Sequence, residues 1–225
     1  MKDMVLNFEK TKKILSKYKI PFCQSEVFKS KTQALKFAKK IGFPVVLKIF
    51  SPDILHRTEI SGVKIGIKNE KEFKRAFDEI LNSVRKEMPQ AKIEGILVQS
   101  QIKGTEIILG MKRDEIFGPV IMFGGGGIFI ELLKDVSFEI CPLIKREARE
   151  MLKRTKVYEI LKGFRGFPRV NIEKIIKIIL NLSELSLREK QIKEIDFNPI
   201  ICNEKEVLVV DAKIIIAATA PPNHP

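Results

Sequence analysis

The sequence predicts an α/β protein of two lobes, and three observations support this class. Several segments repeat apolar residues at helical spacing, and others are short apolar runs bounded by Gly, Pro or polar residues, as strands are. The two kinds alternate along the first part of the chain, and from Ile93 the segments are mainly strand-like. We therefore expect a first lobe over residues 1–98, a second over 99–216 and a flexible tail over 217–225.

The first lobe is expected to alternate helices and strands. Helices are predicted over Phe8–Tyr18, after Ser30 and over Asn69–Arg85, because Ser and Asn are favoured helix N-caps. Alternation in the last strand before Asn69 places Lys64 on one face and Ile65 on the opposite, apolar face. The predicted strands of this lobe are Ser25–Phe28, Phe43–Ile49 and Gly62–Ile67.

The second lobe is expected to combine strands, a run of glycines and three helices. Its helices are predicted at Lys145–Thr155, Val157–Leu161 and Asn171–Leu185, the last one capped by Asn171. An apolar run, Ile128–Leu133, follows the glycines. The predicted strands are Gly95–Gln99, Glu106–Met111, Pro119–Phe123, Ile192–Ile201 and Val207–Ile214.

The net charge of +13 favours an anionic small molecule as the binding partner. The lysines are spread along helices with acidic neighbours and form no basic run interleaved with aromatic residues, so we expect no nucleic-acid binding. Heavy use of Lys, Glu and Ile without any Trp is typical of proteins from hyperthermophiles.

A reducing, cytoplasmic setting is expected. No stretch offers the ~18–20 apolar residues of a membrane span, and the N-terminus turns polar at Glu9–Lys13 without the apolar core of a signal peptide. The three cysteines, Cys23, Cys141 and Cys202, are far apart and lack metal-ligand spacing, so we expect reduced, buried thiols.

Three features of the first 130 residues could carry phosphate chemistry. Lys48 is the one charge in an apolar strand, so it either reaches solvent from an edge strand or contacts phosphates. The run Gly124–Gly127 would let the backbone approach phosphate oxygens, although a tight turn explains it about as well, and it matches neither a Walker loop nor GxGxxG. His56, beside Arg57 in a polar loop, is either a surface residue or a phosphoryl acceptor.

Asp196, Asn198 and Asp211 are candidate metal ligands. Asp196 and Asn198 are two residues apart in one predicted strand and so point to the same face. Asp211 would meet them if its strand pairs antiparallel with theirs. Such hard oxygen ligands suit Mg²⁺, which takes its remaining ligands from water and substrate phosphates. The alternative is a polar outer face.

Three ordered motifs carry a family resemblance. They are Gly42-Phe-Pro-Val-Val-Leu-Lys48 with Ser51-Pro-Asp-Ile-Leu-His56-Arg57 and Gly62-Val-Lys64, then Phe117-Gly-Pro-Val-Ile-Met-Phe-Gly-Gly-Gly-Gly-Ile-Phe-Ile-Glu131-Leu-Leu-Lys134-Asp135, then Lys193-Glu-Ile-Asp196-Phe-Asn198-Pro199 followed by Val-Val-Asp211. Lys103-Gly-Thr-Glu106 and Gly163-Phe-Arg165-Gly166 also fit. Together they resemble the ATP-grasp β subunit of ADP-forming acetyl-CoA synthetases over nearly the whole chain, to about Ile216. Four consecutive glycines are a departure, because relatives commonly carry one larger residue there.

The resemblance implies an ATP-grasp fold whose two lobes close on ATP or ADP with Mg²⁺. By resemblance, Lys48 and Lys64 contact phosphates, Gln99, Gln101 and Ile102 line the adenine slot, Glu106 holds the ribose, and Asn198 and Asp211 hold Mg²⁺ beside the catalytic Asp196. Also by resemblance, Gly125, Gly126 and Gly127 close over the reacting phosphoryl group near the catalytic Glu131, His56 relays phosphate, and Arg165 binds an anion.

The implied reaction is acyl-CoA + ADP + phosphate ⇌ carboxylic acid + ATP + CoA, with acyl phosphate and phosphohistidine intermediates. The resemblance also implies a CoA-binding α subunit and an assembly of α₂β₂ type. Three alternatives stay open: a stand-alone ATP-grasp carboxylate ligase, a regulatory ATP-binding module and a basic nucleic-acid-binding protein. The last gives no reason for Asp196, Asn198 and Asp211.

Overall fold

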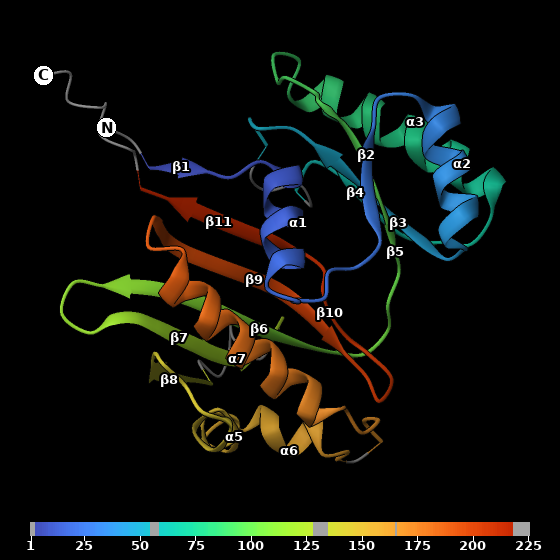
Figure 1. The fold of residues 1–225 in the computed structure, drawn as a ribbon. Coiled ribbons are helices and arrows are strands. Elements are labelled where there is room, and N and C mark those ends of the chain that lie inside the picture. Colours follow the sequence, from blue (N-terminus) through green and yellow to red (C-terminus); the bar gives the residue numbers. More distant parts are fainter. Residues whose placement is uncertain (1–2, 55–58, 128–134, 165, 218–225) are drawn as a thin grey trace, which may run out of the picture. The chain divides into compact units, whose positions relative to one another are not determined.

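The computed structural model describes residues 3–54, 59–127, 135–164 and 166–217 (Figure 1). The chain forms two compact units. The small unit is Cys23–Ile102, and the large unit combines the chain up to Phe22 with the chain from Lys103 onward. Within the described ranges, no helix is long and apolar enough to cross a bilayer.

The small unit packs two helices on an antiparallel sheet. The strand order is β2-β5-β3-β4, and α2 and α3 cover one face of this sheet (Figure 1, blue to green). Each helix and strand predicted in this region is confirmed. The elements are β2 (Ser25–Phe28), α2 (Lys31–Ile41), β3 (Val45–Phe50), β4 (Val63–Ile67), α3 (Glu70–Glu87) and β5 (Gly95–Ser100).

Both helices of the small unit begin at the predicted caps. The Oγ of Ser30 lies 3.5 Å from the backbone N of Gln33, and the Oδ1 of Asn69 accepts a hydrogen bond of 2.9 Å from the N–H of Glu72. These side chains satisfy N–H groups that the first helical turn leaves without a partner. Helix α2 ends at Gly42, whose φ of +86° is a conformation that L side chains rarely adopt.

Strand β3 divides its side chains between the two faces of the small sheet. Val45, Leu47 and Ile49 are fully buried in the core that α2 and α3 close. Because successive side chains of a strand alternate, Lys48 points to the opposite face. The alternation of β3 thus separates the core of the unit from the face that carries its charged residue.

Strand β4 does not keep this alternation. Val45 pairs with Ile67 and Leu47 with Lys64, so β4 has one extra residue between the two pairs. This bulge brings Lys64 to the same face as Ile67, the face that the helices cover. Ile65 is 73% exposed, and the prediction that placed it on an apolar face opposite Lys64 is therefore wrong.

The large unit is a larger antiparallel sheet with helices packed on it. Its strand order is β1-β11-β9-β6-β7-β8, with β10 also paired to β9. The predicted helices and strands are confirmed except that Val207–Ile214 is two strands. The elements are β1 (Met4–Val5), α1 (Phe8–Lys17), β6 (Thr105–Asp114), β7 (Gly118–Gly125), β8 (Val136–Ile140), α5 (Lys145–Lys153), α6 (Val157–Leu161), α7 (Ile172–Arg188), β9 (Ile192–Cys202), β10 (Val207–Val209) and β11 (Ala212–Ile216).

The core of the large unit lies between α5–α7 and one face of this sheet. Leu109 pairs with both Phe123 and Phe197, and the three side chains are fully buried or nearly so. They belong to one apolar cluster with Ile179 and Leu182 of α7. Residues that alternate with them on β6 and β9 lie on the opposite face of the sheet.

The N-terminal segment belongs to the large unit. Met4 pairs with Ile216 across β1 and β11, and Leu15 and Tyr18 are buried in the large core. By contacts, the first 22 residues therefore group with the second half of the chain, whereas the sequence analysis assigned residues 1–98 to one lobe. The lobe boundaries themselves stay a prediction.

All three cysteines, Cys23, Cys141 and Cys202, are buried thiols, as predicted. Burial raises the pKa of the Cys141 and Cys202 thiols above the ordinary value, because a thiolate is poorly solvated in an apolar core. They are small core residues and not reactive nucleophiles.

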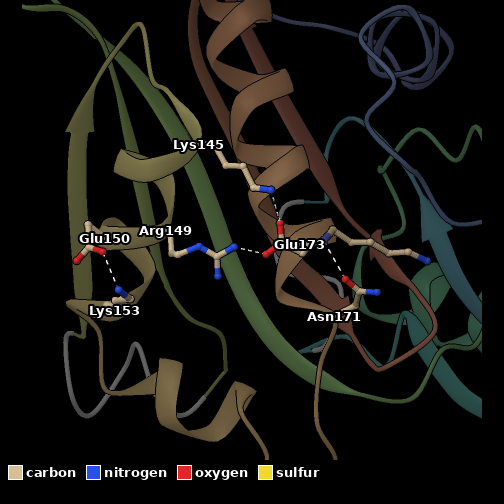
Figure 2. A network of polar contacts seen from close by, with 7 residues as sticks. Lys145, Arg149, Glu150, Lys153, Asn171 and Glu173 are labelled. Carbon is tan, nitrogen blue, oxygen red and sulfur yellow. Dashed lines mark hydrogen bonds and ion pairs between the residues drawn. The ribbon is translucent and has the colours of Figure 1, made fainter.

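An ion-pair network joins α5 to the start of α7 (Figure 2). Glu173 accepts from Lys145 Nζ at 2.9 Å and from Arg149, and the two cations hold the pKa of Glu173 below its ordinary value. Asn171 caps α7, as predicted, by accepting a 3.1 Å hydrogen bond from the N–H of Lys174. The network links α5 and α7 at the surface of the large unit.

Candidate functional site

Lys48 and Gln99 share the face of the small sheet that lies opposite to α2 and α3. Lys48 pairs with Leu97, and Val46, two residues earlier on β3, pairs with Gln99. Neither Lys48 nor Gln99 belongs to the core cluster under the helices. Gln99 is 1% exposed, and its Nε2 donates to Cys23 Sγ at 2.8 Å. Two of the residues predicted to bind nucleotide are thus neighbours on one sheet face.

Lys64 lies on the other face of the same sheet. Its Nζ is 2.9 Å from Oε2 of Glu79 on α3, and this contact lowers the pKa of the Glu79 carboxyl. The bulge in β4 is the cause, because it reverses the side on which Lys64 emerges. The structure therefore does not bring Lys64 and Lys48 together.

Gln101 links the end of β5 to β4. Its Oε1 accepts a 2.8 Å hydrogen bond from the N–H of Gly66, and its own N–H donates to the Pro44 carbonyl at 3.1 Å. With its side chain used in this way, Gln101 fixes the backbone that leads into Ile102, which is half-buried. The predicted adenine-lining segment is held in place within the small unit.

Asp196, Asn198 and Asp211 converge in the large unit. Strands β10 and β11 both pair antiparallel with β9, and Asp211 lies between them. The N–H of Asn198 donates to the Asp211 carbonyl at 3.2 Å. The pairing that the sequence analysis required is present, and Asn198 is exposed while Asp196 and Asp211 are half-buried.

The electrostatics of this cluster favour a cation. Partial burial, with repulsion from Glu194 and Asp211, raises the pKa of Asp196, and Lys213 on the paired strand acts in the opposite direction. A cation bound beside Asp196 would stabilise the ionised form of its carboxyl group. Glu194 and Lys213 were not predicted as part of this cluster, although Glu194 precedes Asp196 by two residues, the spacing that puts side chains of a strand on one face.

The donor set fits Mg²⁺ in number and in chemistry. Over the described ranges, no group of three or more His, Cys, Asp or Glu has metal-binding geometry. Asn198 and Asp211 offer one amide oxygen and one carboxylate, and Mg²⁺ is usually held by one or two carboxylates, with waters and substrate phosphates completing its shell.

The glycine run lies directly on Glu106. The N–H of Gly126 donates to the Glu106 carbonyl at 2.9 Å, and a Cβ added at Gly126 would lie 2.9 Å from Glu106 Cβ and 3.0 Å from its carbonyl carbon. At Gly127 an added Cβ would lie 3.1 Å from Glu106 Oε2. Only glycine permits this approach. The exposed Glu106 carboxylate therefore lies beside the exposed Gly127 just after β7, while Gly125 and Gly126 are buried.

Three predicted residues, His56, Glu131 and Arg165, lie outside the described residues, as does the predicted apolar run Ile128–Leu133. Their assignments stay predictions.

A cavity of about 410 Å³ lies on the helix side of the large unit, away from Asp196. Arg149, Tyr158, Lys162 and Glu173 are among its lining residues. Arg149 is already paired with Glu173, and Lys162 with Glu159 at 2.8 Å. Arg149 and Lys162 are thus each engaged by a carboxylate, and we place the functional site on the opposite face of the sheet, which carries Glu106 and Asp196.

Comparison with known proteins identifies the family. The ATP-grasp domain family matches residues 1–216. The chain is 46% identical to the β subunit of the ADP-forming acetate–CoA ligase I of Pyrococcus furiosus over 206 residues, which are 91% of this chain and 89% of the relative. It is 43% identical over 204 residues to the ADP-forming acetate–CoA ligase I of Archaeoglobus fulgidus, covering 90% of this chain but 30% of that longer protein.

Solved structures that are similar to this chain belong to the same kind of enzyme. The chain superposes with a TM-score of 0.89 and 42% identity on the dinucleotide-forming acetyl-coenzyme A synthetase 1 of Ca. Korarchaeum cryptofilum in complex with coenzyme A and Ca-AMPCP, covering 95% of this chain and 93% of that one. A second structure of the same enzyme holds coenzyme A and Mg-AMPPCP, and its phosphohistidine segment points towards the nucleotide binding site. The chain superposes on it with a TM-score of 0.82 and 38% identity, covering 95% of this chain and 93% of that one. The chain belongs to the ATP-grasp family and, within it, to the β subunits of ADP-forming acetate–CoA ligases.

Proposed function

We propose that this chain is the nucleotide-binding subunit of an ADP-forming acyl-CoA synthetase of the acetate–CoA ligase type. Its reaction is acyl-CoA + ADP + phosphate ⇌ carboxylic acid + ATP + CoA. The observation that carries the proposal is the convergence of Asp196, Asn198 and Asp211 on the sheet face that also carries Glu106. Relatives that are 46% and 43% identical carry this activity in their names.

Asn198 and Asp211 hold Mg²⁺ in this proposal, and Asp196 supports it from the same strand. When bound, Mg²⁺ neutralises charge on the transferring phosphates. The half-buried Asp211 supplies a fixed carboxylate and the exposed Asn198 an amide oxygen that nucleotide phosphates can approach. The raised pKa of Asp196 supports a cation site, because the ionised form there needs a positive partner.

In the small unit Lys48 contacts phosphates, while Gln99, Gln101 and Ile102 line the adenine slot. Lys64 contacts phosphates only after it leaves Glu79, from which it is 2.9 Å away.

In the large unit Glu106 holds the ribose and Gly125–Gly127 close over the phosphoryl group. The close contact of Gly126 with Glu106 supports this role, since the two parts then approach one ligand together. Glu131 assists at the reacting group and Arg165 binds an anion.

His56 carries the phosphoryl group between the two half-reactions. A ring nitrogen of His56 forms a P–N bond as the acyl phosphate P–O bond breaks and releases the carboxylate. The terminal phosphate oxygen of ADP then forms a P–O bond as the P–N bond breaks, which gives ATP and restores the imidazole. The phosphohistidine segment named for the Korarchaeum structure supports this relay.

A CoA-binding α subunit completes the enzyme, and the assembly is of α₂β₂ type. The relative from Pyrococcus is itself a β subunit, and the relative from Archaeoglobus is a longer chain of which this one spans 30%. Exposed apolar side chains in the large unit also support a partner, because such surface is typical of interfaces. Examples are Phe117, Phe138 and Ile140, which are 59%, 56% and 48% exposed.

The test follows label from ATP to the histidine. The chain is incubated with Mg²⁺ and γ-labelled ATP, with and without the CoA-binding partner, and acid-labile, base-stable label is measured. We expect label in the wild type and in His224→Ala, which removes the other histidine, and none in His56→Ala. Label that persists in His56→Ala excludes this residue as carrier. No label in the wild type despite ATP binding favours an ATP-grasp ligase without a relay.

A further inference from the structure

Asp135 is bound to the start of α6 by both of its carboxylate oxygens. Oδ1 accepts from the N–H of Lys156 and Oδ2 from the N–H of Val157, each at 2.9 Å. The helix has no local cap, because the N-cap residue Lys156 makes no side-chain capping bond and the hydroxyl of Thr155 donates to the Leu152 carbonyl. The side chain of Asp135, 21 residues earlier in the chain, takes the place of a local N-cap side chain.

The backbone of Asp135 packs on the glycine run. A Cβ added at Gly124 would lie 2.8 Å from the Asp135 carbonyl oxygen and 2.9 Å from Val136 Cγ1. Gly124 also pairs with Val136 across β7 and β8. The carbonyl of Asp135 therefore lies close to Gly124, while the carboxylate of Asp135 is hydrogen-bonded to the start of α6.

The glycine run is held from the other side by Glu106. The N–H of Gly126 donates to the Glu106 carbonyl, so Gly124–Gly127 lie between Asp135 and Glu106. A displacement of Asp135 would move the backbone that faces Glu106. Since reacting groups must be placed within about 0.5 Å, a small shift here would be felt at the nucleotide.

We propose that Asp135 is a positioning residue for nucleotide phosphates, acting through Gly124–Gly127. The role rests on the proposed function, in which this run closes over the phosphoryl group. The carboxylate is required because each of its oxygens accepts from a different N–H, and an amide offers only one acceptor oxygen.

The competing explanation is that Asp135 is only a structural cap, and Asp114 provides the matched control. Asp114 lies at the other end of the β6–β7 hairpin, and its carboxylate also accepts from two backbone N–H groups, those of Ile116 at 2.8 Å and Phe117 at 2.9 Å. Both bonds go to one oxygen, Oδ1, so Asp114→Asn can keep them, whereas Asp135→Asn must lose one.

The experiment compares Asp135→Ala, Asp135→Asn, Asp114→Ala and Asp114→Asn, each assembled with the CoA-binding partner. We expect Asp135→Ala to raise the KM for ATP about 10- to 100-fold, with a smaller rise in Asp135→Asn. Asp114→Ala is expected to lower the melting temperature by a similar amount to Asp135→Ala while the KM for ATP stays at the wild-type value. Asp114→Asn should match the wild type in both.

Hydrogen exchange of the unliganded chain gives a readout that needs no activity. Asp135→Ala should speed exchange in peptides that cover Gly124–Gly127, and Asp114→Ala should not. Equal KM values in Asp135→Ala and Asp114→Ala, or unchanged exchange in the glycine run, would overturn the proposal. A wild type that transfers no phosphate refutes the proposed function instead, and exchange then still decides whether Asp135 holds this segment.

Discussion

Glu189 joins α1 to the end of α7, and its removal has a calculable effect on the stability of the large unit. The carboxylate accepts from Lys17 Nζ at 2.6 Å, from the Tyr18 hydroxyl at 2.7 Å and from Gln191 Nε2 at 2.8 Å. These hydrogen bonds, Lys17 first, lower the pKa of Glu189 from 4.5 to about 2. Replacement by Gln removes the charge but keeps the size of the side chain.

The magnitude follows from that pKa. A carboxyl that titrates near 2 in the folded chain and 4.5 when unfolded contributes at most ~3 kcal/mol above both values. Glu189 is 15% exposed but the Lys17 side chain is 63% exposed, so solvent screening reduces the figure to about 1–2 kcal/mol. Because the folded pKa is the lower one, this stability is present above pH 4.5 and is lost as the pH falls from 4.5 through 2.

Urea unfolding between pH 7 and pH 3 tests this reasoning. We expect Glu189→Gln to lose about 1–2 kcal/mol of unfolding free energy at pH 7, with the difference from the wild type narrowing as the pH falls below 4.5. The control is Glu184→Gln on the same helix. Glu184 is 55% exposed and forms a surface ion pair with Arg188, so this change should cost less than ~0.5 kcal/mol. A loss of the same size at pH 7 and pH 3 would refute the electrostatic account.

Two further predictions concern the nucleotide. Gly126→Ala should weaken ATP binding by about 10-fold or more, because the added Cβ would lie 3.0 Å from the carbonyl carbon of Glu106 and 3.1 Å from Ile107 N, and β6 cannot move away without distortion. Isothermal titration with Mg-ATP measures the affinity, and an unchanged affinity contradicts the packing argument. Lys48→Ala should raise the KM for ATP more than Lys64→Ala does, because Lys64 is held by Glu79 on the far face of the small sheet. Equal losses in the two variants would mean that Lys64 leaves Glu79 when nucleotide binds.

The helix N-caps were predictable to the residue. Ser30, Asn69 and Asn171 cap the helices that the sequence assigned to them, because capping is a bond between neighbours in the chain. The motif around Asp196 and Asn198 also predicted two oxygen donors on one face of a strand, since alternation has a fixed period of two.

The sequence did not predict features that depend on pairing between distant segments. Lys64 was expected opposite to Ile65 by alternation, but a bulge against β3 turns Lys64 towards α3. The short strands β1 and β8 were missed, and pairing with their partners β11 and β7 defines them.

The sequence by itself determined the α/β class, the helix N-caps at Ser30, Asn69 and Asn171, the buried thiols and the identity of the candidate ligands, all of which follow from local periodicity and residue chemistry. Only the tertiary structure decided that Asp211 meets Asn198, that Gly126 lies on Glu106, that Asp135 caps α6 and that the first 22 residues join the large unit. Strand register and packing cause these contacts, and register is set by the summed fit of whole strands, which no single segment of the chain encodes.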